Sequence, residues 1–217
     1  HMITEGGSDW RKIIVMNTET KQVLEDTIVN VKFSGVSWLG EEGFFYSSYD
    51  NPAENSESEL SAKNEHHKLF YHKLGSNQAD DELIFGGEKQ PFIATQGFVS
   101  EDQKYLVIVA FNGSSGNKMF VWDMSKPKTD LIAISDNEQT RTSYVSNDGK
   151  RFLFLTNIDA PNYRVVSVDL SDPVQDNWKD VIPEGKDVLM ASSAGNKIFA
   201  EYLINAKSAI KQFDFDG

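Results

Sequence analysis

Short apolar runs separated by polar turns recur along the whole chain. Two of these runs, residues 105–109 (YLVIV) and 152–155 (FLFL), are apolar at every position, so each is predicted to be a strand covered on both faces. Each run follows a polar segment, 101–104 or 147–150, of the kind that closes a hairpin. No segment offers a long stretch with the period of about 3.6 residues that marks an amphipathic helix. The pattern therefore predicts an all-β protein.

The same order of motifs appears several times along the chain. Residues 97–123 and 142–169 both carry an aromatic followed by Val-Ser, a charged turn, an apolar run, and a final strand that ends in Asp. The offset between these two copies is 46 residues, both from Ser100 to Ser146 and from Asp123 to Asp169. A weaker copy lies around residue 195. An earlier copy begins at residue 35, where a polar, largely acidic insertion at 51–66 lengthens the offset to 60 residues.

A repeat of about 40–50 residues that holds about four short strands is typical of a propeller blade. We therefore predict a partial β-propeller of about four blades, each a four-stranded antiparallel sheet. Residues 1–2 are interpreted as a tag remnant and residues 3–217 as a piece of a propeller. The first and last units are expected to be incomplete, and the units are placed at 10–30, 33–87, 92–135, 140–184 and 187–217.

The amino-acid composition restricts the classes of partner and of chemical site that this protein is expected to have. The chain has 217 residues, 21 Lys and Arg against 33 Asp and Glu, and a net charge of −12. Nucleic acids and anionic membranes need a basic surface, so neither is expected as a partner. No apolar run approaches the ~20 residues that span a bilayer. The absence of cysteine excludes disulfides, thiolate metal sites and a cysteine nucleophile.

A serine nucleophile of the G-x-S-x-G type is not found. The segment GSSG at 113–116 has the wrong spacing and is predicted to be a hairpin loop, and Gly7-Ser8 has no apolar strand before it. The chain alone is therefore expected to be inactive as a peptidase.

The histidines do not form a predicted metal site. His66 and His72 are expected about 20 Å apart on an extended strand, and His66 and His67 point to opposite faces. We predict that these three side chains are solvated, and neither a metal nor an organic cofactor is expected. Solvated surface charge is likewise predicted for the carboxylates Glu41, Glu42, Glu57, Glu59, Asp80, Asp81 and Glu82.

The ordered set of segments resembles the propeller of the prolyl oligopeptidase family, especially its bacterial members. The likeness runs from GGSDWRKIIVMNTETKQVLEDTIVNVKFSGVSWLGEEGFFYSSYD at 6–50 through HHKLFYHKLGSNQADDELIFGG at 66–87, and it continues through SEDQKYLVIVAFNGSSGNKMFVWDM, APNYRVVSVDL and WKDVIPE. The resemblance implies a seven-bladed propeller that covers an α/β-hydrolase domain and admits short peptides. It also implies cleavage after proline by a Ser-Asp-His triad, which would lie outside this chain in the hydrolase domain of the same parent.

The resemblance further implies three residues that line the outer part of the substrate pocket. Phe33, in VKFSGVSW, matches an aromatic of that pocket, although a Phe packed between blades is an equal alternative. Phe111 stands where mammalian members carry an arginine that binds a substrate carbonyl. Since Phe has no such donor, either another group supplies it or the subsite prefers a more apolar residue. Ser114 lies near a further pocket position.

Two functions remain open at this level. The first is a gating and substrate-filtering segment of a serine peptidase that acts on short proline-containing peptides. The second is a non-enzymatic propeller that binds a protein or peptide. Open strand edges are expected to promote self-association of the isolated chain, unless residues 10–28 complete the last unit and close a four-bladed ring. The parent's compartment, periplasmic or cytoplasmic in a bacterium, is left open.

Overall fold

The computed structural model describes residues 1–4, 9–49 and 66–217, and shows an all-β chain. Most of the predicted insertion at 51–66, with Glu57 and Glu59, lies outside these residues, as does the Gly7-Ser8 pair. The strands in chain order are β1 (Met2–Thr4), β2 (Arg11–Met16), β3 (Val23–Leu39), β4 (Gly43–Ser48), β5 (Lys68–Lys73), β6 (Glu82–Gly86), β7 (Ala94–Val99), β8 (Tyr105–Phe111), β9 (Lys118–Asp123), β10 (Ile132–Ser135), β11 (Thr142–Asp148), β12 (Arg151–Thr156), β13 (Arg164–Asp169), β14 (Lys179–Ile182), β15 (Leu189–Ala194), β16 (Lys197–Ile204) and β17 (Lys207–Phe213). Two single-turn helices, η1 (Gln78–Asp80) and η2 (Gln175–Asn177), precede β6 and β14.

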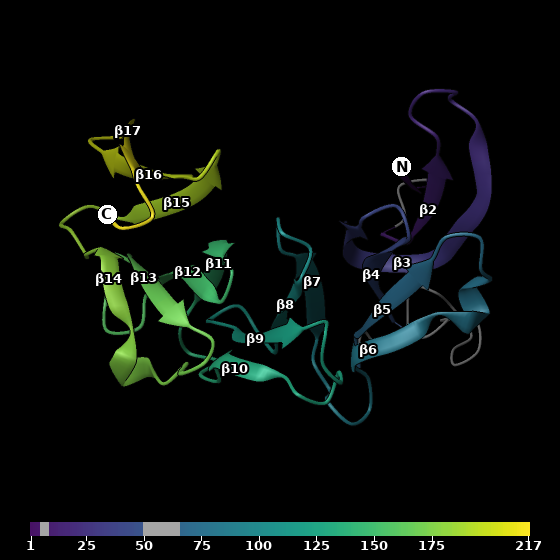
Figure 1. The fold of residues 1–217 in the computed structure, drawn as a ribbon, viewed down its shortest axis with the longest axis horizontal. Coiled ribbons are helices and arrows are strands. Elements are labelled where there is room, and N and C mark those ends of the chain that lie inside the picture. The colour runs from purple at the N-terminus through teal and green to yellow at the C-terminus, as the bar shows by residue number, and fades with distance from the viewer. Residues whose placement is uncertain (5–8, 50–65) are drawn as a thin grey trace. The chain divides into compact units, whose positions relative to one another are not determined.

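The strands form four sheets in which neighbours along the chain are neighbours in the sheet (Figure 1). The first sheet has six strands, β1 to β6. Two sheets of four strands follow, β7 to β10 and β11 to β14, and the last sheet contains β15 to β17. This up-and-down order confirms the predicted partial β-propeller of antiparallel sheets. Within the described residues no sheet closes on itself.

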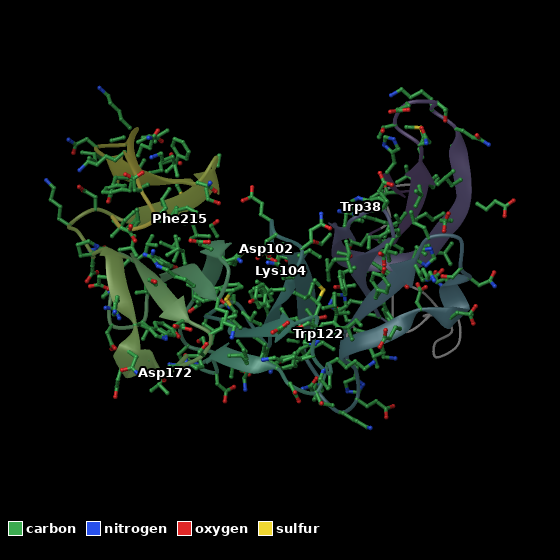
Figure 2. All side chains as sticks on the ribbon, in the orientation of Figure 1. Trp38, Asp102, Lys104, Trp122, Asp172 and Phe215 are labelled. Atoms are coloured by element: carbon green, nitrogen blue, oxygen red, sulfur yellow. The ribbon has the colours of Figure 1, made fainter. Side chains whose placement is uncertain are left out.

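The uniformly apolar runs lie where the pattern placed them. Residues 105–110 of β8 are buried without exception, and in β12 Phe152, Leu153 and Phe154 are buried as well. The polar segment before β8 forms a tight turn, in which the Ser100 hydroxyl donates to Asp102 at 2.6 Å and accepts from the Tyr105 amide at 3.0 Å. Figure 2 shows Asp102 and Lys104 together at this turn. Strands β11 and β12 are joined by the second predicted hairpin, which is thereby confirmed.

Contacts between residues divide the chain into two units, each described by itself. Unit 1 comprises residues 1–99 and 108–112, and unit 2 comprises 100–107 and 113–217. The core of unit 2 joins two sheets, because Leu153 and Val165 of one sheet pack in the same cluster as Leu189 and Ile198 of the next. In unit 2 the sheet β11 to β14 thus buries a face on the sheet β15 to β17, which accounts for the apolar side chains of Leu153 and Val165.

One buried apolar cluster of unit 1 lies within its six-stranded sheet. The cluster consists of buried apolar side chains of β2, β3 and β4: Ile13, Val15, Ile28, Val31, Phe44 and Tyr46. Strand β3 is longer than predicted, since Val23 to Leu39 form one strand that pairs with β2 in its first half and with β4 in its second. The boundary predicted between the units 10–30 and 33–87 therefore falls inside β3, where the structure has a bulge. The candidate site lies on this bulge.

Candidate functional site on the bulge of strand β3

The bulge interrupts the pairing of β3 with β4. Val31 pairs with Ser48, but the next pair is Val36 with Tyr46, so β3 places several extra residues opposite a short piece of β4. Phe33 adopts a φ of +52° inside the bulge. A bulky residue in this left-handed region costs about 1–2 kcal/mol, and bulges of this kind re-aim side chains. The result is a phenylalanine whose side chain is 49% exposed in the middle of a strand.

Three aromatic rings gather around this bulge. The ring of Tyr49, at the end of β4, meets Phe33 edge-on at a centroid distance of 6.3 Å and meets Trp10 edge-on at 6.5 Å. The ammonium of Lys32 lies 5.2 Å from the centroids of both the Trp10 and Phe33 rings. A cation between two ring faces is attracted by their quadrupoles. We call Trp10, Lys32, Phe33 and Tyr49 the bulge site.

The side chain of His67 supports the bulge site through hydrogen bonds to the backbone and a contact with the Tyr49 ring. Its Nδ1 accepts a hydrogen bond from the Thr95 amide at 2.8 Å, so the proton resides on Nε2, which donates to the Lys32 carbonyl at 3.0 Å. Burial lowers the pKa of His67 to about 4, and the hydrogen bond from Nε2 to the Lys32 carbonyl opposes this effect only in part. The ring is fully buried and packs against the Tyr49 ring at a centroid distance of 4.3 Å, with the two planes tilted by 40°. The prediction of a solvated His67 is therefore wrong, because the backbone around the bulge supplies both hydrogen-bond partners.

A chain of hydrogen bonds connects the bulge site with Phe111. The Tyr49 hydroxyl donates to the Ile93 carbonyl, and the Ile93 amide donates to the Phe111 carbonyl at 2.9 Å. Burial raises the pKa of Tyr49 to about 12, so the hydroxyl keeps its proton at neutral pH. The structure thus brings Phe33 and Phe111 to the same end of unit 1.

Ser114, the third predicted pocket residue, belongs to unit 2. It is exposed in the loop between β8 and β9, and its carbonyl accepts from the Arg141 guanidinium at 2.5 Å. The GSSG segment around it joins two strands, which confirms the predicted hairpin loop.

A groove of about 320 Å³ is lined in part by the bulge itself, through Ser34 and Gly35. Its walls come from the second half of β3, from β4 and from β7. Ser34 fixes the bulge to β4 because its hydroxyl accepts from the Ser47 amide at 2.8 Å. Phe98 of β7 also lines the groove and is 43% exposed. The groove is therefore a mixed surface of hydroxyls, glycine backbone and aromatic rings.

A second buried histidine lies at the other end of β5. The Nδ1 and Nε2 atoms of His72 lie 2.7 Å from Asp81 and 3.2 Å from Asp26, and Tyr46 donates to Asp81 at 2.8 Å. Burial acts to raise the pKa of Asp26, but the Gly75 amide and the His72 ring outweigh it and hold that pKa below its usual value. Burial raises the pKa of Asp81, and the hydrogen bonds from His72 and Tyr46 offset this only in part.

The His72 cluster corrects two predictions. His72 and the Asp81 carboxylate were both predicted to be solvated, yet their side chains are 1% and 2% exposed. The prediction failed because Asp26, distant in sequence, supplies the other half of a closed network. Since the network is enclosed and holds no nucleophile, it is a structural element of the sheet. Glu41, Glu42, Asp80 and Glu82 are exposed as predicted.

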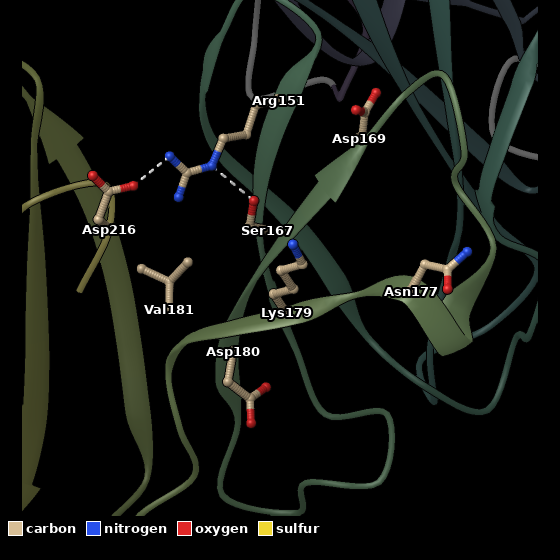
Figure 3. Close-up of a pocket in the computed structure, with 8 residues that line it drawn as sticks. All are labelled: Arg151, Ser167, Asp169, Asn177, Lys179, Asp180, Val181 and Asp216. Atoms are coloured by element: carbon tan, nitrogen blue, oxygen red, sulfur yellow. Dashed lines mark hydrogen bonds and ion pairs between the residues drawn. The ribbon is translucent and has the colours of Figure 1, made fainter.

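Unit 2 contains a larger pocket, of about 410 Å³, on strands β12 to β14 (Figure 3). Each guanidinium nitrogen of its Arg151 donates a hydrogen bond: Nε to Ser167 at 2.9 Å, Nη1 to Asp216 at 2.6 Å and Nη2 to the Phe215 carbonyl at 2.6 Å. These bonds fasten the segment after β17 to β12. Arg151 therefore acts as a clamp within unit 2.

Among the described residues, no group of three or more His, Asp or Glu side chains is placed to hold a metal ion. No helix in the described part of the chain is long and apolar enough to cross a membrane.

The fold and the bulge site define a β-propeller domain with an aromatic surface at one end of a blade. The chain belongs to the family described as prolyl oligopeptidase, N-terminal β-propeller domain, which matches residues 2–217. It is 45% identical over 217 residues to a prolyl endopeptidase of Elizabethkingia miricola and 44% identical to that of Elizabethkingia meningoseptica. Both alignments cover 100% of this chain and 30% of the relative.

Solved structures agree with this assignment. A chain from a structural and mechanistic study of two prolyl endopeptidases superimposes with a TM-score of 0.87 at 30% identity, over 100% of this chain and 31% of that one. Apo prolyl oligopeptidase B from Galerina marginata superimposes with a TM-score of 0.82 at 24% identity, over 100% of this chain and 32% of that one, which supports the fold alone. The chain therefore spans about a third of the length of the proteins that it matches.

Proposed function

We propose that this chain is the substrate-filtering propeller segment of a serine peptidase that cleaves short peptides after proline. The observation that carries the proposal is the 45% identity, over all 217 residues, to a protein named prolyl endopeptidase. The bond-breaking groups would come from an α/β-hydrolase domain of the same parent, where a serine attacks, a histidine acts as base and an oxyanion hole stabilises the tetrahedral intermediate.

The bulge site supplies a physical reason for a role in substrate binding. A phenylalanine held half exposed at a positive φ lowers the stability of the fold, and strain of this kind concentrates at functional sites. We assign Phe33, Phe111 and Ser114 to the lining of the peptide pocket. The hydrogen bonds that run from Tyr49 through Ile93 to Phe111 support the first two assignments.

Steady-state kinetics on the gene product that contains this chain test the proposal. We expect cleavage of a short chromogenic peptide after proline. Phe33→Ala should raise KM about tenfold with little change in kcat, because an aromatic contact contributes about 0.5–1.5 kcal/mol beyond its buried area. Trp38→Ala is the matched control, since Trp38 is 46% exposed on the same strand. Phe111→Arg should alter subsite preference, because it adds donors.

Absence of any cleavage after proline would contradict the peptidase function and favour a binding module. Cleavage with a KM that neither Phe33→Ala nor Phe111→Arg changes would contradict the pocket assignment alone. The self-association of the isolated chain stays a prediction.

A further inference from the structure

Lys32 is an unusual lysine in an acidic protein. Its side chain is 9% exposed, whereas lysines usually lie in solvent. The chain carries 33 carboxylate side chains. Nevertheless, no carboxylate or carbonyl oxygen of the described residues lies within hydrogen-bond or ion-pair distance of its ammonium. By contrast, Lys118 pairs with Asp136 at 2.7 Å on the surface of unit 2.

The aromatic contacts of Lys32 attract its charge but leave its hydrogen bonds unused. Ring faces provide a favourable quadrupole, whereas an ammonium has three N–H donors that require oxygen acceptors. Among the described residues, Lys32 Nζ is not one of the fully buried atoms that lack a partner, so its unused donors face solvent, where a ligand can reach them. The ammonium lies 5.2 Å from the centroid of the Trp10 ring and 5.2 Å from that of the Phe33 ring, and these two rings hold its donors in place.

The position of the ammonium is fixed by the backbone as well. The carbonyl of Lys32 accepts from Nε2 of His67, and the neighbouring residue Phe33 is held by the bulge. A donor with little freedom loses little entropy when it binds an acceptor. The arrangement is therefore preorganised for a ligand that combines an oxygen acceptor with an apolar group.

We infer that Lys32 binds a carboxylate of a peptide ligand, while the rings of Trp10, Phe33 and Tyr49 hold the adjacent apolar side chain. A carboxylate is favoured over a neutral carbonyl because charge-assisted hydrogen bonds are roughly twice as strong. This inference rests on the proposed peptide-binding function and adds a selectivity for acidic or free C-terminal groups at one subsite.

Binding of two small probes to the 217-residue chain tests the inference. N-acetyl-L-proline and N-acetyl-L-prolinamide share the ring and differ in charge at the carboxyl group. In NMR titrations we expect the carboxylate to bind at least about fivefold more tightly than the amide. Lys32→Met keeps the apolar stem and should reduce the ratio of the two dissociation constants to about one, whereas Lys32→Arg should preserve it. Lys73→Met is the charge-matched control, since Lys73 is exposed on β5.

The side-chain resonances of Lys32 provide a measurement that needs no variant. They should shift on addition of N-acetyl-L-proline more than those of Lys73. A ratio near one in the unmodified chain, or a ratio that survives in Lys32→Met, would overturn the inference. Phe33→Ala should weaken the binding of both probes by a similar factor, because it removes the ring and leaves the ammonium; unchanged binding of both probes would contradict the role of the ring.

Discussion

The two buried histidines at the ends of β5 have opposite environments, although they lie five residues apart. His67 faces one backbone donor and one backbone acceptor, which together fix a neutral ring. His72 faces a carboxylate at each nitrogen, and carboxylates only accept, so its ring donates from both nitrogens when it is protonated. The difference shows that the groups which distant strands bring to each ring determine whether its nitrogens donate or accept hydrogen bonds.

The two rings also serve different parts of unit 1. His72 joins the first half of β3, through Asp26, to the turn before β6, through Asp81. His67 holds the carbonyl of Lys32 in the bulge and the start of β7. We therefore regard His72 as part of the scaffold and His67 as the support of the bulge site.

Removing the His72 ring should have the largest effect on stability. His72→Ala leaves Asp26 and Asp81 buried without their shared partner, and breaking a buried ionic network costs about 3–5 kcal/mol. Urea denaturation at neutral pH measures the loss. Lys73→Ala, at the exposed neighbouring position, should change the free energy of unfolding by less than about 0.5 kcal/mol. A loss below about 1 kcal/mol for His72→Ala would place both carboxylates in solvent and remove the contrast between the two histidines.

The contrast between the two histidines also shows which features of the fold leave a local pattern in the sequence and which do not. Runs such as 105–109 predicted the strands because burial on both faces leaves a local pattern, and the repeat at 46 residues predicted the sheets. The partners of His72 left no such pattern, since Asp26 lies 46 residues away on another strand. Charged residues in a polar segment look solvated until the fold encloses them, as Asp81 shows.

The bulge site was predictable only in part. The resemblance to the family pointed to Phe33, whose role in a pocket stays a prediction, whereas Lys32, Tyr49 and Trp10 were not predicted. The segment VKFSG gave one usable signal, because a lysine and an exposed aromatic interrupt the apolar alternation of a strand. The positive φ at Phe33 and the hydrogen bonds of His67 depend on the register of β3 with β4, which no local pattern encodes.

The pH dependence of stability should separate His67 from all other groups. Its pKa is about 4 in the folded chain, against 6.5 for a free imidazole. The unfolded chain therefore takes up a proton as the pH falls through 6.5, whereas the folded chain does so only near 4. Stability should decrease across this window, by about 3 kcal/mol for a shift of this size.

His67→Gln isolates this contribution, since the amide can donate and accept but does not titrate. Denaturation at several pH values between 6.5 and 4 should show a weaker decrease in the variant than in the unmodified chain. The carboxylates titrate equally in both and cancel in the difference. Parallel pH profiles would mean that His67 is accessible to protons in the folded state, like a surface histidine.

The smallest change in stability is expected at Phe33, and this result would separate the bulge site from the scaffold most sharply. Asn tolerates a positive φ, so Phe33→Asn relieves about 1–2 kcal/mol of backbone strain. It also loses the ring contact with Tyr49, which contributes about 0.5–1.5 kcal/mol. These opposing effects should leave the free energy of unfolding within about 1 kcal/mol of its original value.

Phe44→Ala, at a fully buried phenylalanine of β4, should instead cost about 3–5 kcal/mol. Thermal denaturation of both variants decides the matter. If Phe33→Asn destabilises the chain as much as Phe44→Ala does, the Phe33 ring is part of the core and the strain at its φ has a structural cause. If it does not, the strained backbone serves the presentation of the ring.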